Sequence, residues 1–205
     1  VWLCPTSNSY VRIKQVPPLF IRSLIMAEDA SFYSHHGLDW FEIKESFRRN
    51  IEEWRFARGG STITQQLAKN LYLSKEKTID RKIKEFFLAK QIEKHLSKSQ
   101  ILEKYVNVVE FGPKIFGIQK AARHYFDKAV ESLNILESMY LVSLLPSPIR
   151  YSQSFNERKL SRTNISRMKI ILGRLYRTKR IPDDIYVFCE TLLDTYDWPF
   201  PYYSN

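Results

Sequence analysis

Apolar residues recur every three or four positions along most of the chain, which is the spacing of one face of an α-helix. Only 6 glycines interrupt this pattern, and helical spacing prevails over the alternation that is typical of strands. The sequence therefore predicts an all-α domain. Proline, glycine and capping residues place the helices at about 17–37, 39–58, 62–71, 78–96, 98–109, 115–126, 132–145, 156–180 and 183–194.

Capping residues mark three of these helix starts. Asp39 can cap the second helix, Thr62 and Gln65 form a capping box before the third, and Ser97 precedes the fifth. In the helix at 78–96 we expect an inward apolar face that consists of Ile79, Ile83, Phe86, Ala89, Ile92 and Leu96.

The segment at 38–57 mixes aromatic residues with arginines. Two interpretations fit this pattern. The segment can lie at a membrane surface with its aromatic residues in the lipid and its arginines near phosphates, or it can pack on the protein core. The pattern alone favours the core.

The length of 205 residues and a hydrophobic content of 44% predict one folded domain. No apolar run approaches the roughly 18 residues that span a bilayer. The chain begins with Val1 rather than Met, so we expect residues 1–16 to be a lead-in from a membrane anchor that this sequence does not include. Cys4 and Cys189 lack the spacing of metal ligands, and the sequence leaves their pairing open.

The formal net charge of +10 predicts an anionic partner, which leaves nucleic acid, anionic lipid and phosphorylated substrates open. Residues 156–180 contain nine Lys or Arg and one acid, Glu157. Leu160, Ile165, Met168, Leu172 and Leu175 make this helix amphipathic. A solvated basic face over a core stripe fits better than a dedicated binding helix.

An acidic pair, Glu28 and Asp29, lies in the aromatic stretch AEDASFYSHHG at 27–37. If the helix continues through residue 35, then Glu28, Phe32 and His35 share one face. Burial raises the pKa of a carboxyl group, as a general acid or base near neutral pH requires. The alternative is an acidic pair in solvent at a helix end.

The stretch RKIKE at 81–85 places Arg81 and Lys82 one helical turn from Glu85. It is either an ordinary surface ion-pair cluster or a site whose cations stabilise a phosphate-bearing leaving group, which Lys69 and Lys77 can join. No phosphate loop, nucleophile elbow or pair of histidines at metal spacing is present. A pair of carboxylates, Glu28 and Glu85, among amides and cations suits transfer at a sugar carbon.

Five segments follow one another along the chain: AEDASFYSHHG at 27–37, RGGSTITQQLAKNLYL at 58–73, RKIKE at 81–85, ILEKYVNVVEFG at 101–112 with GIQKAARHYF at 117–126, and YLVSLLPSP at 140–148. In this order they resemble the five motifs of the peptidoglycan glycosyltransferases, glycosyltransferase family 51. The resemblance covers about residues 17–180, and GGSTITQQ is by itself highly specific. Val106 and the PSP ending of the fifth segment depart conservatively from the family pattern, and FGPKIFG and ARHYF resemble monofunctional members.

This resemblance implies a mainly α, lysozyme-like, bilobed domain over 1–205, with a membrane-facing jaw and a C-terminal extension at 181–205. It also implies polymerisation of lipid II with inversion and release of undecaprenyl pyrophosphate. Glu28 matches the catalytic base, and Glu85 matches a second catalytic glutamate that orients the site or binds a divalent cation, Mg or Mn. No other cofactor is implied. The matched phosphate-binding residues are Lys69, Lys77, Arg81 and Lys82, and the matched cleft residues are Asp29, His35, Arg58, Ser61, Gln65 and Asn70.

The implied partners are lipid II, the growing glycan strand, the membrane surface and cell-wall synthesis proteins, with no nucleic acid. The implied location is the periplasmic or outer face of the inner membrane. The resemblance also reverses the preference for core packing of the segment at 38–57, which corresponds to the membrane-facing region between the first two motifs.

Two rival functions remain to be weighed. A lysozyme-like hydrolase or lytic enzyme would cleave glycan, but a neutral glycan has no leaving phosphate for the cations of RKIKE to stabilise. A non-catalytic membrane or nucleic-acid binding module would use the basic helix, but it would not require both glutamates.

Overall fold

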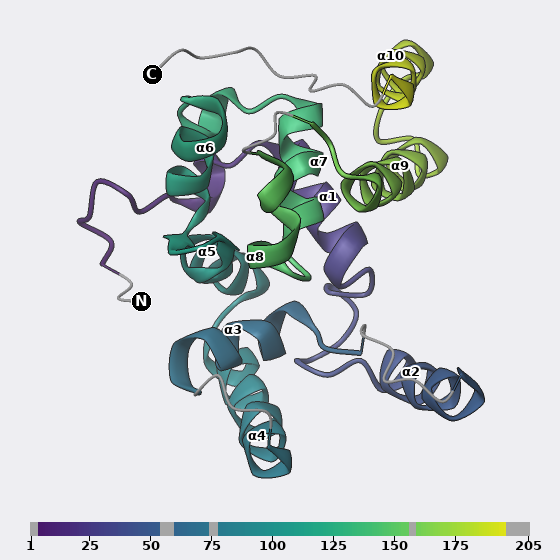
Figure 1. Cartoon of the computed structure of the whole chain (residues 1–205). Coiled ribbons are helices and arrows are strands. Elements are labelled where there is room, and N and C mark those ends of the chain that lie inside the picture. Colours follow the sequence, from purple (N-terminus) through teal and green to yellow (C-terminus); the bar gives the residue numbers. More distant parts are fainter. Residues whose placement is uncertain (1–3, 54–59, 74–77, 156–158, 196–205) are drawn as a thin grey trace.

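The computed structural model describes residues 4–53, 60–73, 78–155 and 159–195, with the side chains of 47 and 49–53 left out. Helices dominate this part of the chain, as the apolar spacing predicts (Figure 1). The α-helices are α1 (Pro18–Glu28), α2 (Trp40–Glu53), α3 (Ile63–Tyr72), α4 (Ile79–His95), α5 (Lys98–Val108), α6 (Ile118–Phe126), α7 (Ile135–Leu144), α8 (Pro148–Tyr151), α9 (Arg162–Arg177) and α10 (Asp183–Asp194). Three 3₁₀ turns, at Ile13–Gln15, Val130–Ser132 and Gln153–Phe155, complete the described helical structure.

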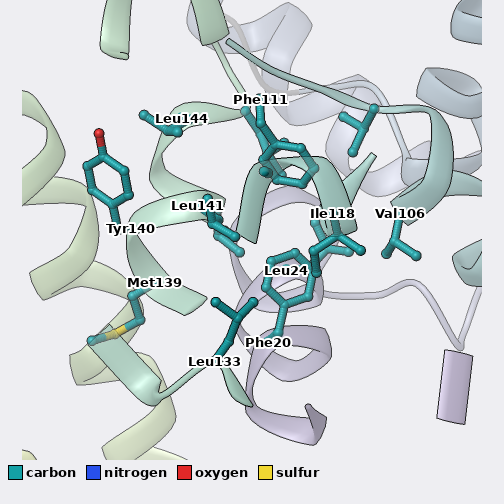
Figure 2. Close-up of a cluster of buried hydrophobic side chains, with 14 of the residues drawn as sticks. Phe20, Leu24, Val106, Phe111, Ile118, Leu133, Met139, Tyr140, Leu141 and Leu144 are labelled. Carbon is teal, nitrogen blue, oxygen red and sulfur yellow. The ribbon is translucent and has the colours of Figure 1, made fainter. Parts of the chain in front are cut away.

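Helix α7 forms the centre of the main body. Nine of its ten residues are buried, as expected for a helix that is covered on all sides. It packs against α1 and α9, and α10 packs in turn against α9. Figure 2 shows the apolar cluster at this junction, where α1 contributes Phe20 and Leu24 and α7 contributes Leu141 and Leu144.

Helices α2, α3 and α4 lie at the opposite end of the molecule from α10 (Figure 1). Helix α3 packs against both α4 and α5. Its residues Ile63, Leu67 and Ala68 are fully buried, so α3 connects the α4 end to the main body. The predicted caps are confirmed, because Asp39 accepts from the amide of Glu42, Thr62 and Gln65 form the capping box, and Ser97 accepts from the amide of Gln100.

A short antiparallel hairpin joins α5 to α6, and its second strand takes up the first residues of the helix predicted at about 115–126. Strand β1 (Glu110–Gly112) pairs with β2 (Ile115–Phe116). Pro113 lacks the amide hydrogen that a continuing helix would need, and Lys114 adopts a positive φ of 63° in the turn. Gly117 follows at the N-cap position of α6 with a φ of 85°.

Helix α1 ends at Glu28, so the prediction that residues 28–35 continue the helix is wrong. Asp29 has an extended backbone with φ −163°, and its carboxylate accepts hydrogen bonds from the Ile63 amide and from His35. These contacts hold 29–37 in a series of turns. Glu28, Phe32 and His35 therefore do not share a helical face.

The inward face predicted for α4 is wrong at its first two positions. Ile79 is 83% exposed and Ile83 is 51% exposed, whereas the buried stripe runs through Glu85, Ala89 and Ile92. Near its N-terminus α4 therefore turns its charged residues toward α3 and leaves its isoleucines outside. The apolar period is helical, but it does not identify which face has a partner.

Two further expectations concern exposed and basic segments. On α2, Trp40 and Phe41 are 63% and 74% exposed, which contradicts core packing of these residues; 54–57 lie outside the described residues. All five predicted apolar positions of the basic segment are buried, and four of them lie on α9, which is shorter than 156–180. Cys4 and Cys189 are both free thiols. No helix in the described ranges is long and apolar enough to cross a membrane.

Candidate active site

Glu28, the last residue of α1, has a nearly buried carboxylate whose side chain is 11% exposed. Gln66 Nε2 on α3 donates to Oε2 of Glu28 at 3.0 Å, and Arg167 Nη2 on α9 lies 3.6 Å from Oε1. Burial raises the pKa of Glu28, while the Gln66 hydrogen bond and the charges of Arg167 and Lys69 act in the opposite direction. A carboxylate with a raised pKa is suited to take a proton near neutral pH.

Asp29, the residue after Glu28, fixes the position of the segment that follows α1. Its Oδ2 accepts from the Ile63 amide at 2.9 Å, which ties it to the first residue of α3. The amide of Gly37 donates to Nδ1 of His35, so in the neutral imidazole Nε2 carries the proton that is donated to Asp29. Asp29 and His35, both predicted to line the cleft, therefore bind each other and hold 29–37 against α3.

Gln65, another predicted cleft residue, is 2% exposed and belongs to the helix cap. Its side-chain oxygen accepts from the amide of Thr62, and Thr62 Oγ1 accepts from the Gln65 amide while donating to the carbonyl of Gly37. The side chain of Gln65 is therefore occupied by the cap, and the following glutamine, Gln66, is the one that contacts Glu28. Asn70, on the same helix, is half-buried.

Glu85 is 2% exposed and is neutralised by two cations of its own helix. Arg81 Nη1 donates to Oε2 of Glu85 at 2.8 Å, and the ammonium of Lys82 forms an ion pair with Oε1. Lys82 also donates to Oγ of Ser61 at 2.9 Å. The predicted cluster of Arg81, Lys82 and Glu85 therefore exists, and it reaches the start of α3 through Ser61.

Lys69 on α3 connects the two glutamates electrostatically. Desolvation lowers the pKa of Lys69, with Arg81 and Lys82 acting in the same direction, while the charges of Glu85 and Glu28 oppose the shift. Lys69 is thus within electrostatic range of both glutamates. Arg58 and Lys77, the remaining predicted site residues, lie outside the described residues.

A hollow of about 510 Å³ adjoins Glu28. Ser61, the hydrogen-bond partner of Lys82, lies in its wall, so the cation cluster borders this hollow. Acidic and hydroxyl residues outnumber the apolar ones in its wall, so the hollow offers hydrogen-bond partners to a ligand with many hydroxyl groups. The lining residues are Met26, Ala27, Glu28, Asp29, Ala30, Ser31, Asp39, Phe41, Glu42, Gly60, Ser61, Thr62, Arg174 and Thr178.

A divalent cation at Glu85 does not fit this arrangement. Both carboxylate oxygens already bind cations of α4, and Mg²⁺ or Mn²⁺ would need further oxygen ligands. In the described part of the chain, no three His, Cys, Asp or Glu side chains gather into a group that could hold a metal ion.

A family model described as Transglycosylase matches residues 4–176 of the chain. The chain belongs to the transglycosylase family. The peptidoglycan glycosyltransferase resemblance of the five motifs is thereby confirmed, as is a mainly α, lysozyme-like domain. This transglycosylase is accordingly an enzyme that transfers glycosyl groups.

Named relatives agree with this assignment. Two biosynthetic peptidoglycan transglycosylases, from Nitrosospira multiformis and Nitrosomonas eutropha, are 40% and 41% identical to this transglycosylase over 166 and 175 residues. These alignments cover 81% and 85% of this chain and 70% of each relative. Penicillin-binding protein 1A of Clostridium tetani is 37% identical over 83% of this chain, which corresponds to 22% of that larger protein.

Three residues that contact or support Glu28 were not among the predicted site residues of this transglycosylase: Gln66, Tyr105 and Arg167. Gln66 lies inside the specific GGSTITQQ stretch, so this motif could have identified it as a site residue. Arg167 was counted only within the basic segment, where sequence does not distinguish it from solvated neighbours. Tyr105 is fully buried and its hydroxyl donates to Gln66 Oε1 at 2.9 Å, a contact that α-helical periodicity does not reveal.

Proposed function

We propose that this transglycosylase builds peptidoglycan glycan strands from lipid II, with Glu28 as the general base. The observation that carries the proposal is a largely buried carboxylate of raised pKa beside a hollow whose wall continues into a cluster of cations. The names of the relatives support peptidoglycan as the product. A peptidoglycan transglycosylase is an enzyme of the cell envelope.

In the proposed reaction, Glu28 takes the proton of the 4-hydroxyl group of the acceptor sugar. That oxygen attacks the anomeric carbon of the donor sugar from the face opposite the phosphate. The bond from the anomeric carbon to the pyrophosphate oxygen breaks as the new glycosidic bond forms, so the configuration inverts. Undecaprenyl pyrophosphate leaves with the electron pair of the broken bond, and the proton remains on Glu28 until solvent removes it.

In this proposal, the negative charge that develops on the leaving group is stabilised by Lys69, Arg81 and Lys82. Preorganised cations stabilise charge that develops in the transition state, and a pyrophosphate needs no protonation to leave. Glu85 orients two of these cations, because its oxygens bind Arg81 and Lys82. A hydrolase of neutral glycan would instead need a carboxylic acid near the leaving oxygen, a role that the ion-paired Glu85 does not suit.

The proposed reaction uses the cations of the protein in place of a metal ion at Glu85. The ion pairs of Glu85 with Arg81 and Lys82 support this assignment. The predicted contacts of Asp29, His35, Arg58, Ser61, Gln65, Asn70 and Lys77 with substrate are part of the same proposal. The structure supports them to different degrees, since Ser61 lines the hollow whereas Gln65 is occupied by the helix cap.

The proposed location is the outer face of the cytoplasmic membrane, where lipid-linked substrate resides. Large apolar side chains on α2 and α4 support contact with lipid. Trp40, Phe41, Ile79, Ile83 and Phe87 are between 51% and 83% exposed. Exposed apolar groups of this size favour an amphiphilic surface over water. Cell-wall synthesis proteins remain proposed partners.

Incubation of the protein with lipid II in detergent tests this function. The expected products are glycan polymer and free undecaprenyl pyrophosphate. One pyrophosphate should be released for each glycosidic bond formed. Purified uncrosslinked glycan, incubated in parallel, should remain intact. Cleavage of that glycan without any product from lipid II would overturn the proposed function in favour of a hydrolase.

A further inference from the structure

A buried tyrosine and a glutamine form a hydrogen-bonded chain that ends at the proposed base. The hydroxyl of Tyr105 on α5 donates to Oε1 of Gln66 on α3 at 2.9 Å, and Nε2 of Gln66 donates to Oε2 of Glu28 at 3.0 Å. Tyr105 is fully buried, so water does not compete for its hydroxyl. The chain therefore links three helices at the point where the base is placed.

Hydrogen-bonding capacity determines how the Gln66 amide must be oriented. An ionised carboxylate only accepts, so the amide must present its NH₂ group to Glu28 and its oxygen to Tyr105. A rotated amide would place its oxygen against the carboxylate and leave the buried Tyr105 hydroxyl hydrogen without an acceptor. The Tyr105 hydroxyl thus selects the amide orientation that stabilises ionised Glu28.

The two oxygens of Glu28 are not equivalent as a result. Oε2 is held by Gln66, whereas the described cation nearest to Oε1, Arg167, lies at 3.6 Å, beyond hydrogen-bond distance. We propose that Tyr105 and Gln66 act as a positioning pair that keeps Glu28 ionised and presents Oε1 to the acceptor hydroxyl. This inference rests on the proposed role of Glu28 as the base.

Other charged groups around Glu28 also affect the ionisation of its carboxylate. Arg167 on α9 and Lys69 on α3 favour the ionised carboxylate, and Asp29, the next residue along the chain, opposes it. Gln66 makes the largest contribution that lowers the pKa of Glu28 against the effect of burial. Loss of the pair therefore moves the pKa of the base upward, because the ionised form loses its hydrogen bond.

Tyr105→Phe removes the hydroxyl and keeps the buried ring, and Gln66→Met removes the amide with little change in volume. The expected result is an acid limb of kcat for lipid II polymerisation that moves up by about half a pH unit or more in both variants, with KM unchanged. Gln66→Met should show the larger shift, because it removes the direct contact. A merely structural role would lower the thermal stability without moving the pH profile.

Tyr125→Phe is the matched control. Tyr125 is also a buried tyrosine, and its hydroxyl donates to the carbonyl of Phe111 at 2.9 Å. This variant should lose stability to a similar extent and retain the wild-type pH profile. A Tyr105→Phe enzyme with the wild-type profile, or a Tyr125→Phe enzyme with an equal shift, would overturn the positioning pair. Wild-type activity of Glu28→Gln would instead overturn the proposed base, and the inference with it.

Discussion

Lys82 donates a hydrogen bond to Ser61 across 2.9 Å and 21 positions of sequence. Because the same ammonium pairs with Glu85, one side chain joins the cation cluster of α4 to the wall of the hollow beside Glu28. Glu28 of α1, the proposed base, and the cation cluster of α4, proposed to stabilise the leaving group, therefore border the same hollow.

Lys82→Ala should lower kcat for lipid II polymerisation by about 100-fold, because one preorganised cation at the leaving group is lost. Lys84→Ala is the control on the same helix. Lys84 is 61% exposed and pairs with Asp80 in solvent, so its loss should change the rate by less than about twofold. A Lys82→Ala enzyme whose rate also changes by less than about twofold would contradict a role of Lys82 at the pyrophosphate.

Glu28→Gln should abolish polymerisation while lipid II binding persists, since the amide cannot take a proton. Its effect on stability should depend on pH. The pKa of Glu28 is raised in the folded state, so the wild-type protein loses stability as the pH rises from the ordinary carboxyl pKa through the raised value. Relative to wild type, Glu28→Gln should thus gain stability as the pH rises from the ordinary carboxyl pKa through the raised pKa of Glu28.

Thermal unfolding of Glu28→Gln and wild-type protein across that range measures this difference. A gap in melting temperature that is independent of pH would show that Glu28 has the same pKa in the folded and unfolded chains. A lipid II pull-down with the same two proteins separates lost binding from lost chemistry.

Substitution by alanine should have opposite effects on protein stability at two of the glycines. A Cβ at Gly173 in α9 meets no atom within 4 Å, so Gly173→Ala should stabilise the protein by about 0.5–1 kcal/mol. At Gly117 the backbone has φ 85°, and a Cβ would lie 2.8 Å from the Asn107 carbonyl oxygen. Gly117→Ala should therefore cost about 2 kcal/mol or more. Urea unfolding of both variants checks the signs.

Polymerisation should continue in the presence of a chelator, at a rate within about twofold of that in Mg²⁺, because Arg81 and Lys82 already neutralise Glu85. Lipid II assays with EDTA, with Mg²⁺ and with Mn²⁺ measure this. More than a tenfold loss in EDTA that added Mn²⁺ restores would contradict the assignment of leaving-group stabilisation to the protein alone.

Sequence predicts those features of this molecule that depend on neighbours within one helical turn. Thr62 and Gln65 are three positions apart and form the capping box that their spacing predicts. Arg81, Lys82 and Glu85 occupy one turn of α4 and form the predicted cluster. These interactions require only that the segment be helical, which the apolar spacing establishes.

Features that depend on distant partners could not be predicted in this way. Helix α1 ends at Glu28 because Asp29 binds the amide of Ile63, which is 34 positions away. Gln66 is 38 positions from Glu28, and no local pattern predicts the contact between them. Ile79 and Ile83 follow the helical period, yet they are exposed because no described helix packs over that face of α4. Long-range packing decides each of these outcomes.

Asp29 has a consequence for how substitutions in 27–37 should be interpreted. Its carboxylate holds both the His35 ring and the start of α3, the helix that carries Gln66 and Lys69. An inactive His35 variant can therefore owe its defect to a displaced helix while the chemical groups themselves are intact. Genetic screens that score growth alone will group such scaffold defects with defects of the base, whereas ligand-induced stabilisation will separate the two classes.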